Sequence, residues 1–239
     1  MYRFYAQPEN ITPDKITLTE DETRHLRDVL RLRTGDIVGV FDGLGREYKC
    51  SIEAIEKRSS LVTIIDEIEP RSPESGFELT LAPALLKGEK FDLIVQKAVE
   101  LGVTRVIPLK TVRCDVKLGD NAKRLDRWRR IALEATKQCG RASLMSVMEP
   151  ATLESLIAKA VADEVMMFSE REGEEFTVSS ELRAATAIFG PEGGWDDSEV
   201  ELARENGVRI VTLAGRILRA ETAVVAISAI LQHRFGDLK

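Results

Sequence analysis

The sequence has few of the residues that build metal centres and disulfide frameworks. It contains two histidines and three cysteines in 239 residues. His25 and His233 lie far apart, and Cys50, Cys114 and Cys139 are widely spaced and form no CxxC pair. This pattern argues against a zinc site and against hydrolysis by a Ser–His or Cys–His pair. We expect no metal, and reduced cysteines with a structural role.

Long hydrophobic runs and an excess of positive charge are also missing. The longest apolar run, residues 223–231, is broken by Ser228 and is far shorter than the about 20 residues that span a bilayer. The first ten residues lack the pattern of a signal peptide. We therefore expect a cytoplasmic protein without a membrane segment. The formal net charge is −6, so any binding of nucleic acid must depend on local basic patches.

Familiar nucleotide-binding loops are absent as well. There is no Walker A sequence, and Gly43-x-Gly45 lacks the third glycine and the following helix of a dinucleotide fingerprint. The chain is 44% hydrophobic and 31% charged, which is typical of a soluble protein with a substantial core. Its length fits one large domain or two small ones.

The pattern of predicted elements changes once along the chain. Residues 2–6, 37–41, 47–55 and 61–68 read as short strands separated by turns, which favours a small β-barrel. The stretch that follows is rich in turn residues, and strands then alternate with helices, which predicts a mostly parallel sheet. We expect an α/β fold with a barrel at 1–70, a linker at 71–76 and a second domain at 77–239.

One predicted helix in the first part, residues 19–32, carries a basic stripe. Arg24, Arg27 and Arg31 are spaced i, i+3 and i+7, with His25 and Arg33 nearby. The helix also has an acidic first turn and a plausible N-cap at residue 19. The stripe is either a solvated face balanced by acidic neighbours or a phosphate-binding surface, and the spacing alone leaves both open.

Two glycine-rich loops follow predicted strands near the C-terminus. Residues 184–189 run into GPEGGW, and residues 208–213 run into LAGRILRAETA. The C-terminal loops of neighbouring parallel strands form the usual ligand crevice of an α/β sheet. Asp196 and Glu199 have the spacing of a capping box for the helix between the loops. The charges at Arg216, Arg219 and Glu221 are either a structural ion pair or part of a ligand site.

The last predicted helix, residues 220–235, is apolar on nearly all sides. A terminal helix of a domain this size should have one polar face. It is therefore either central to the core or covered by a second subunit, and we favour the second subunit.

Taken together, these motifs resemble a known family. FGPEGGW followed by LAGRILRAETA resembles the paired signature of the bacterial small-subunit ribosomal RNA uridine-N3 methyltransferases of the SPOUT class. Further similar segments are VLRLRTGDIVGVFDGLGREY, KGEKFDLIVQKAVELGVTRVIPL, KQCGR and RFGDLK, so that the resemblance covers nearly the whole chain.

The resemblance implies a fold, a cofactor and a substrate. The second domain would contain a deep trefoil knot, and the first would be a PUA-like RNA-binding barrel. The cofactor would be S-adenosylmethionine, held by the loop after Phe168 and by residues 190–194 and 213–222. The protein would work as a homodimer through its C-terminal helix. Its substrate would be a uridine in 16S ribosomal RNA, in the assembled small subunit.

The residues that the resemblance and the charge pattern assign are as follows. The expected cofactor-binding residues are Phe168, Gly190, Pro191, Glu192, Gly193, Gly194, Leu213, Gly215, Ile217, Leu218, Arg219 and Thr222. The expected RNA-binding residues are Arg24, Arg27, Arg31, Arg33, Arg113, Lys123, Arg124 and Arg127. The expected catalytic residues are Arg141 and Arg219, which would stabilise charge on the uracil ring, and Glu221 as orienter or proton acceptor.

The sequence departs from the family pattern at Ala214, at Lys137 and in residues 112–115. The last departure weakens the expected RNA contact at residues 113–117. Two other functions are compatible with the fold. One is an RNA-binding assembly factor without turnover, and the other is a SPOUT enzyme that acts on a different RNA.

Overall fold

The chain divides into two compact units. The computed structural model describes residues 1–114, 121–177, 181–213 and 215–238. The first unit comprises Met1–Glu74 and Thr136–Leu144, and the second comprises Ser75–Ala135 and Met145–Lys239. The division after Glu74 falls within the expected linker at 71–76, whereas residues 136–144 were expected in the second domain.

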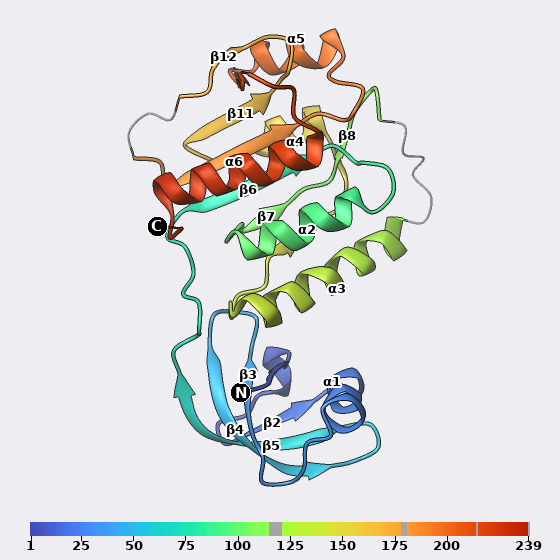
Figure 1. Ribbon diagram of the computed structural model, residues 1–239, viewed down its shortest axis with the longest axis vertical. Helices are drawn as coiled ribbons and strands as arrows, with labels where there is room; N and C mark the ends of the chain where they lie inside the picture. Colours follow the sequence, from blue (N-terminus) through green and yellow to red (C-terminus); the bar gives the residue numbers. More distant parts are fainter. Residues whose placement is uncertain (115–120, 178–180, 214, 239) are drawn as a thin grey trace. The chain divides into compact units, whose positions relative to one another are not determined.

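The first unit contains a five-stranded sheet in the order β1-β3-β4-β5-β2 (Figure 1). The strands are β1 (Arg3–Tyr5), β2 (Lys15–Leu18), β3 (Ile37–Phe41), β4 (Glu47–Ile55) and β5 (Ser60–Ile68). The β3–β4 hairpin turns at Gly43 and Gly45, whose φ angles of 78° and 108° favour glycine. Alternate residues of β3 and β4, including Val38, Val40 and Ile52, form its core.

The basic stripe does not form as the sequence predicts. Helix α1 (Glu20–Arg24) continues as the π-helical segment His25–Val29 and ends before Arg31, whose φ of 55° lies outside the helical region. Arg24 is ion-paired with Asp21, and Arg27 is paired with Asp28. The predicted helix 19–32 is therefore too long. The ion pairs match the alternative of a face balanced by acidic neighbours, and phosphate binding by these arginines stays a prediction.

The second unit is built on a seven-stranded parallel sheet in the order β12-β14-β11-β13-β6-β7-β9. Its strands are β6 (Glu78–Pro83), β7 (Arg105–Val106), β9 (Ser146–Val147), β11 (Glu164–Phe168), β12 (Glu174–Glu175), β13 (Ala184–Phe189) and β14 (Arg209–Thr212). β8 (Leu109–Lys110) and β10 (Ala151–Thr152) form a separate parallel pair. The helices are α2 (Lys90–Glu100), α3 (Asn121–Cys139), α4 (Leu153–Lys159), α5 (Asp197–Glu205) and α6 (Ala220–Phe235).

The sheet of the second unit is covered on both faces, as a parallel sheet requires. Figure 1 shows α2 and α6 side by side on one face. On the other face, Ala82 and Ile188 pack with α4 and α5 residues such as Leu156 and Val200. The predicted capping box of α5 is confirmed, because Asp196 caps the helix and Glu199 returns a hydrogen bond to the cap. None of the helices in the described ranges is long and apolar enough to cross a membrane.

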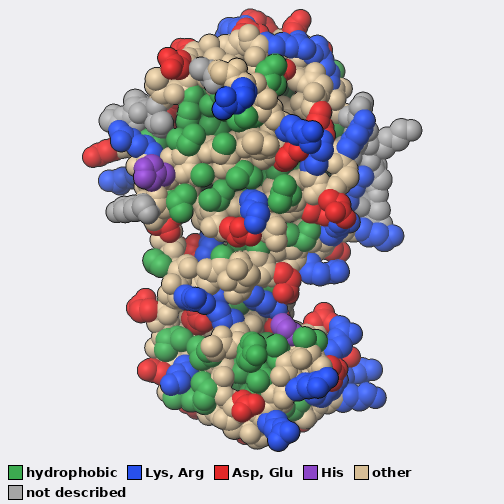
Figure 2. All heavy atoms as spheres, in the orientation of Figure 1, with side chains coloured by type: hydrophobic (Ala, Val, Ile, Leu, Met, Phe, Trp, Pro, Cys, Tyr) green, Lys and Arg blue, Asp and Glu red, His purple; other side chains and the backbone are tan. Residues whose placement is uncertain are grey.

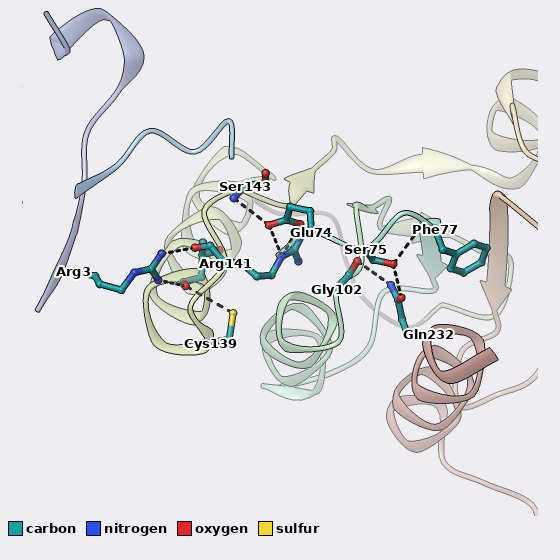
Figure 3. Close-up of polar contacts among 10 residues, drawn as sticks. Arg3, Glu74, Ser75, Phe77, Gly102, Cys139, Arg141, Ser143 and Gln232 are labelled. Atoms are coloured by element: carbon teal, nitrogen blue, oxygen red, sulfur yellow. Dashed lines mark hydrogen bonds and ion pairs between the residues drawn. The ribbon is translucent and has the colours of Figure 1, made fainter. Parts of the chain in front are cut away.

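Arg3 connects the two chain segments of the first unit. Its guanidinium makes two hydrogen bonds to Glu47, of 2.8 and 2.9 Å. It also donates to the carbonyl oxygens of Thr136 and Lys137 near the end of α3 and to that of Arg141, which follows the helix. Figure 3 shows Arg3 directed toward Arg141. A cation beside carbonyl oxygens near the C-terminal end of a helix is favourable for the helix terminus. Because both side chains of the pair are buried, the loss of one would leave the other charge uncompensated.

We therefore expect Arg3→Met to destabilise the first unit by about 3–5 kcal/mol. The matched control is Lys15→Met, whose pair with Glu53 is exposed and should contribute less than about 1 kcal/mol. Native-state hydrogen exchange of the β3 and β4 amides in the full-length protein measures both. Equal effects of the two substitutions would show that Arg3 does not hold this unit together.

Candidate functional site

The second unit contains a cavity of about 410 Å³ at the C-terminal ends of β11 and β13, beside the loop that follows β14. Parallel strands direct their C-terminal loops to one edge, so both glycine-rich loops meet here. The lining residues are Lys90, Phe168, Ser169, Glu170, Phe189, Gly190, Pro191, Glu192, Leu213, Gly215, Arg216, Ile217, Leu218, Arg219, Ala220 and Ala223.

Two stacked phenylalanine rings, from the last residues of β11 and β13, line the cavity. The rings of Phe168 and Phe189 are nearly parallel, with centroids 4.9 Å apart, and both are buried. Trp195 Nε1 donates a hydrogen bond of 2.8 Å to the Phe168 carbonyl oxygen. Gly190 lies against the Trp195 ring, where an added Cβ would approach to 3.1 Å. The tryptophan thus fixes the first glycine-rich loop against the neighbouring strand end.

The charged residues of the cavity come from three segments. Lys90, at the start of α2, donates a hydrogen bond of 2.7 Å to Glu192 in the first loop. Burial raises the pKa of Glu192, but the hydrogen bond from Lys90 and the charges of Lys90 and Lys87 lower it, and the net pKa lies below its ordinary value. Arg216 and Arg219 come from the second loop. The cavity therefore offers cations and a carboxylate beside an aromatic surface.

Most of the expected cofactor residues are brought together here. Those that line the cavity are Phe168, Gly190, Pro191, Glu192, Leu213, Gly215, Ile217, Leu218 and Arg219. Gly193, Gly194 and Thr222 are not among the lining residues. Gly193 faces Arg113, and Gly194, with a φ of 70°, lies beside Glu170. Ala214 lies outside the described residues.

The three expected catalytic residues fall in different places. Arg219 lines the cavity and is the N-cap residue of α6, and Glu221 is in the first turn of that helix. Glu221 Oε2 is buried and, among the described residues, has no hydrogen-bond partner. Arg141 belongs to the first unit, where its buried guanidinium pairs with Glu74 at 2.7 Å (Figure 3). Glu74 also accepts a hydrogen bond from the Ser143 amide, so the pair orders this segment.

The expected RNA-binding residues are also divided. Arg31 and Arg33 are exposed in the first unit. In the second unit, Arg127 on α3 pairs with Asp92 of α2 and with Glu89, the N-cap residue of that helix. Arg113 pairs with Asp196 at 3.2 Å. Lys123 and Arg124 lie in the first turns of α3. Residues 115–117, part of the expected contact, lie outside the described part of the chain.

Sequence reasoning missed Lys90 as a lining residue. It lies in the KGEKFDL segment, and the family resemblance of that segment is a signal that could have indicated a functional role. No local pattern, however, indicates that the start of α2 lies next to Glu192. Ser169 and Glu170 were missed as individual residues, although the loop after Phe168 was expected to contribute. In the described ranges, no group of His, Cys, Asp and Glu residues could hold a metal ion.

Two family models match the chain. A model described as RNA methyltransferase domain matches residues 73–232, and one described as RNA methyltransferase PUA domain matches residues 18–65. The first covers the unit that contains the cavity, and the second covers part of the five-stranded sheet.

Curated proteins and a solved structure are similar over nearly the whole chain. A Ribosomal RNA small subunit methyltransferase E from Synechocystis sp. is 35% identical, over 93% of this chain and 74% of that protein. One of the same name from Aquifex aeolicus is 32% identical, over 98% and 100%. The crystal structure of a Ribosomal RNA small subunit methyltransferase E from Neisseria gonorrhoeae, bound to S-adenosyl methionine, is 34% identical with a TM-score of 0.90 and complete coverage of both chains.

The Lys90–Glu192 pair makes a prediction about pH. Because the pKa of Glu192 is lowered, the pair contributes stability above the ordinary carboxyl pKa and loses it as the pH falls through the lowered value. The contribution is small, since both side chains are more than a third exposed. Lys90→Met should raise the pKa of Glu192, as measured by a carbon-13 NMR titration of that carboxyl group. Lys97→Met, which removes a pair with Glu100 on the same helix, should leave this titration unchanged.

Proposed function

The chain belongs to the Ribosomal RNA small subunit methyltransferase E family, and from this premise we propose that it transfers a methyl group from S-adenosylmethionine to N3 of one uridine in 16S ribosomal RNA. The observation that carries the proposal is the cavity at the strand ends, because it is lined by both glycine-rich loops of the family signature. The substrate form that we propose is the assembled small subunit.

The residues of the cavity fit this cofactor. A volume of about 410 Å³ lies within the range of small-ligand sites. Phe168 and Phe189 supply an apolar, aromatic wall for the adenine. Glu192 and Glu170 offer carboxylates to the ammonium and sulfonium charges, and Lys90 offers a cation to the carboxylate. When bound, the cofactor supplies an electrophilic methyl group.

The protein must then orient the uracil and help to remove the proton from N3. Loss of that proton places negative charge on O2 and O4 of the ring. The Arg219 guanidinium, which lines the cavity, would stabilise this charge. Glu221 Oε2 is a buried acceptor without a donor in the described part of the chain, and we propose that it takes or orients the proton. Arg141 is a second proposed source of positive charge, with its guanidinium oriented by Glu74.

We also propose that two copies pair through α6, in the cytoplasm. In support, Ile230 of α6 is 43% exposed, and Ile217 and Leu218 before the helix are 82% and 38% exposed. Figure 2 shows hydrophobic side chains along the face that α6 forms. We further propose that the second unit contains the deep trefoil knot that the family resemblance implies.

RNA binding in a protein of net charge −6 requires cations that are not already neutralised. Arg31, Arg33 and Arg124 have no ion pair within the described residues, unlike Arg24, Arg27 and Arg127. We propose that these three make phosphate contacts.

The function is tested by incubating small subunits from a deletion strain with the protein and methyl-labelled S-adenosylmethionine. Nucleoside mass spectrometry should show N3-methyluridine in 16S ribosomal RNA. Arg219→Ala should lower the single-turnover rate by about 100-fold, the effect of losing one donor to a developing negative charge. Arg234→Ala, in the last turn of the same helix, is the matched control and should leave the rate unchanged. Methylation at another atom, or none with the native protein, would contradict the proposal.

Trp195 should matter for the cofactor as well as for stability. Trp195→Phe leaves the buried Phe168 carbonyl without its donor and should cost about 1–3 kcal/mol. Trp128→Phe is the matched control, because it removes a similar hydrogen bond to Asp92 on α2. We expect calorimetry to show weaker binding of S-adenosylmethionine only for Trp195→Phe. Equal affinities for the two variants would mean that the loop does not need this hydrogen bond.

A further inference from the structure

A second cavity, of about 350 Å³, lies on the face of the sheet that α4 covers. It shares no lining residue with the first cavity. Its lining residues are Thr80, Arg105, Ile107, Met148, Glu149, Pro150, Ala151, Ser155, Leu156, Lys159, Ala160, Val161 and Thr186. All of them belong to the second unit.

Three of these residues form a polar row across the sheet. Thr186 on β13 is in register with Thr80 on β6, and Thr80 is in register with Arg105 on β7. Residues paired in register on parallel strands direct their side chains to the same face. Two residues further along β6 and β13, the same face carries Ala82 and Ile188 of the apolar core. The polarity is therefore confined to one end of a sheet face that is otherwise apolar, as the interior of a parallel sheet usually is.

The two threonine hydroxyls of the row have no hydrogen-bond partner within the described ranges. Among the described residues, no hydrogen bond engages the side chain of Thr80 or Thr186. Thr186 is 4% exposed and lines the cavity. Polar groups in such positions are normally hydrogen-bonded. A ligand with acceptor oxygens would satisfy them.

The charges of the cavity are also unpaired. Arg105 and Lys159 line it together with one carboxylate, Glu149, and within the described ranges none of the three forms an ion pair. By contrast, Arg204 and Arg209 in the same unit are paired with glutamates. The lining thus carries a net positive charge that no ion pair of the described residues neutralises.

We propose that this cavity binds the phosphate group of a ligand of nucleotide size. The planar guanidinium of Arg105 can donate two parallel hydrogen bonds to phosphate oxygens, and Lys159 adds a second positive charge. The hydroxyls of Thr80 and Thr186 can donate to the remaining oxygens. The apolar side chains of Ile107, Leu156 and Met148 offer a surface for a base. The phosphate comes either from a free nucleotide or from a nucleotide within RNA.

The test uses the full-length protein with the first cavity saturated by S-adenosylhomocysteine. Inorganic phosphate, uridine monophosphate and a short single-stranded RNA are titrated separately, and backbone amide chemical shifts are followed. We expect saturable shifts at Thr80, Ser155 and Thr186. Arg105→Gln with Lys159→Gln should weaken binding at least about tenfold, which corresponds to the loss of one charge-assisted hydrogen bond. Arg204→Gln with Lys97→Gln removes the same charge elsewhere in the unit and should change the affinity less than about twofold.

The arms of this experiment separate the sources of the phosphate. Binding of uridine monophosphate or inorganic phosphate identifies a site for a free phosphate compound. Binding of the RNA alone, at the same amides, identifies a contact to an RNA backbone. The proposal is overturned if no probe shifts these amides, or if the two double variants bind equally. Retained affinity for S-adenosylhomocysteine shows that each variant is folded.

Discussion

One buried hydrogen bond, from Trp195 to the Phe168 carbonyl, determines where the first glycine-rich loop lies. It joins the end of β11 to the loop after β13, and a Cβ added at residue 190 would lie 3.1 Å from the tryptophan ring, which is a tight contact. The stacked rings of Phe168 and Phe189 depend on the same register between the two strands. The two phenylalanines at the strand ends therefore contribute the aromatic part of the lining, and most of the remaining lining residues come from the loops that follow the strands.

Several arginines of this protein form ion pairs within their own unit. Arg3 is bound to Glu47, Arg141 to Glu74 and Arg209 to Glu164. The arginines in these pairs are already neutralised and are not available to a polyanion. Recognition of RNA by such a protein depends on a small number of positions rather than on an overall positive field.

The features that the sequence predicts well are those encoded locally. The strands 37–41, 47–55 and 184–189 and the final helix match the structure, because alternation, apolar runs and caps lie within a few residues of one another. The ligand crevice is also predictable, because the C-terminal ends of neighbouring parallel strands lie at the same edge of the sheet. Contacts between distant segments were not predictable. Nothing near Arg141 indicates that Glu74 will hold it, and nothing near Glu192 indicates Lys90. The helix predicted at residues 19–32 ends before Arg31, where the backbone leaves the helical region.

The membership of Thr136–Leu144 in the first unit has a consequence for synthesis on the ribosome. When residues 1–74 have emerged, Glu47 and Arg3 can already pair, but the carbonyl oxygens that Arg3 also binds have not yet been translated. The N-terminal unit can be completed only after the intervening residues 75–135 of its neighbour have emerged. The order of folding along the nascent chain therefore differs from the order of the sequence, and a truncation after residue 74 yields an unfinished unit rather than an independent domain.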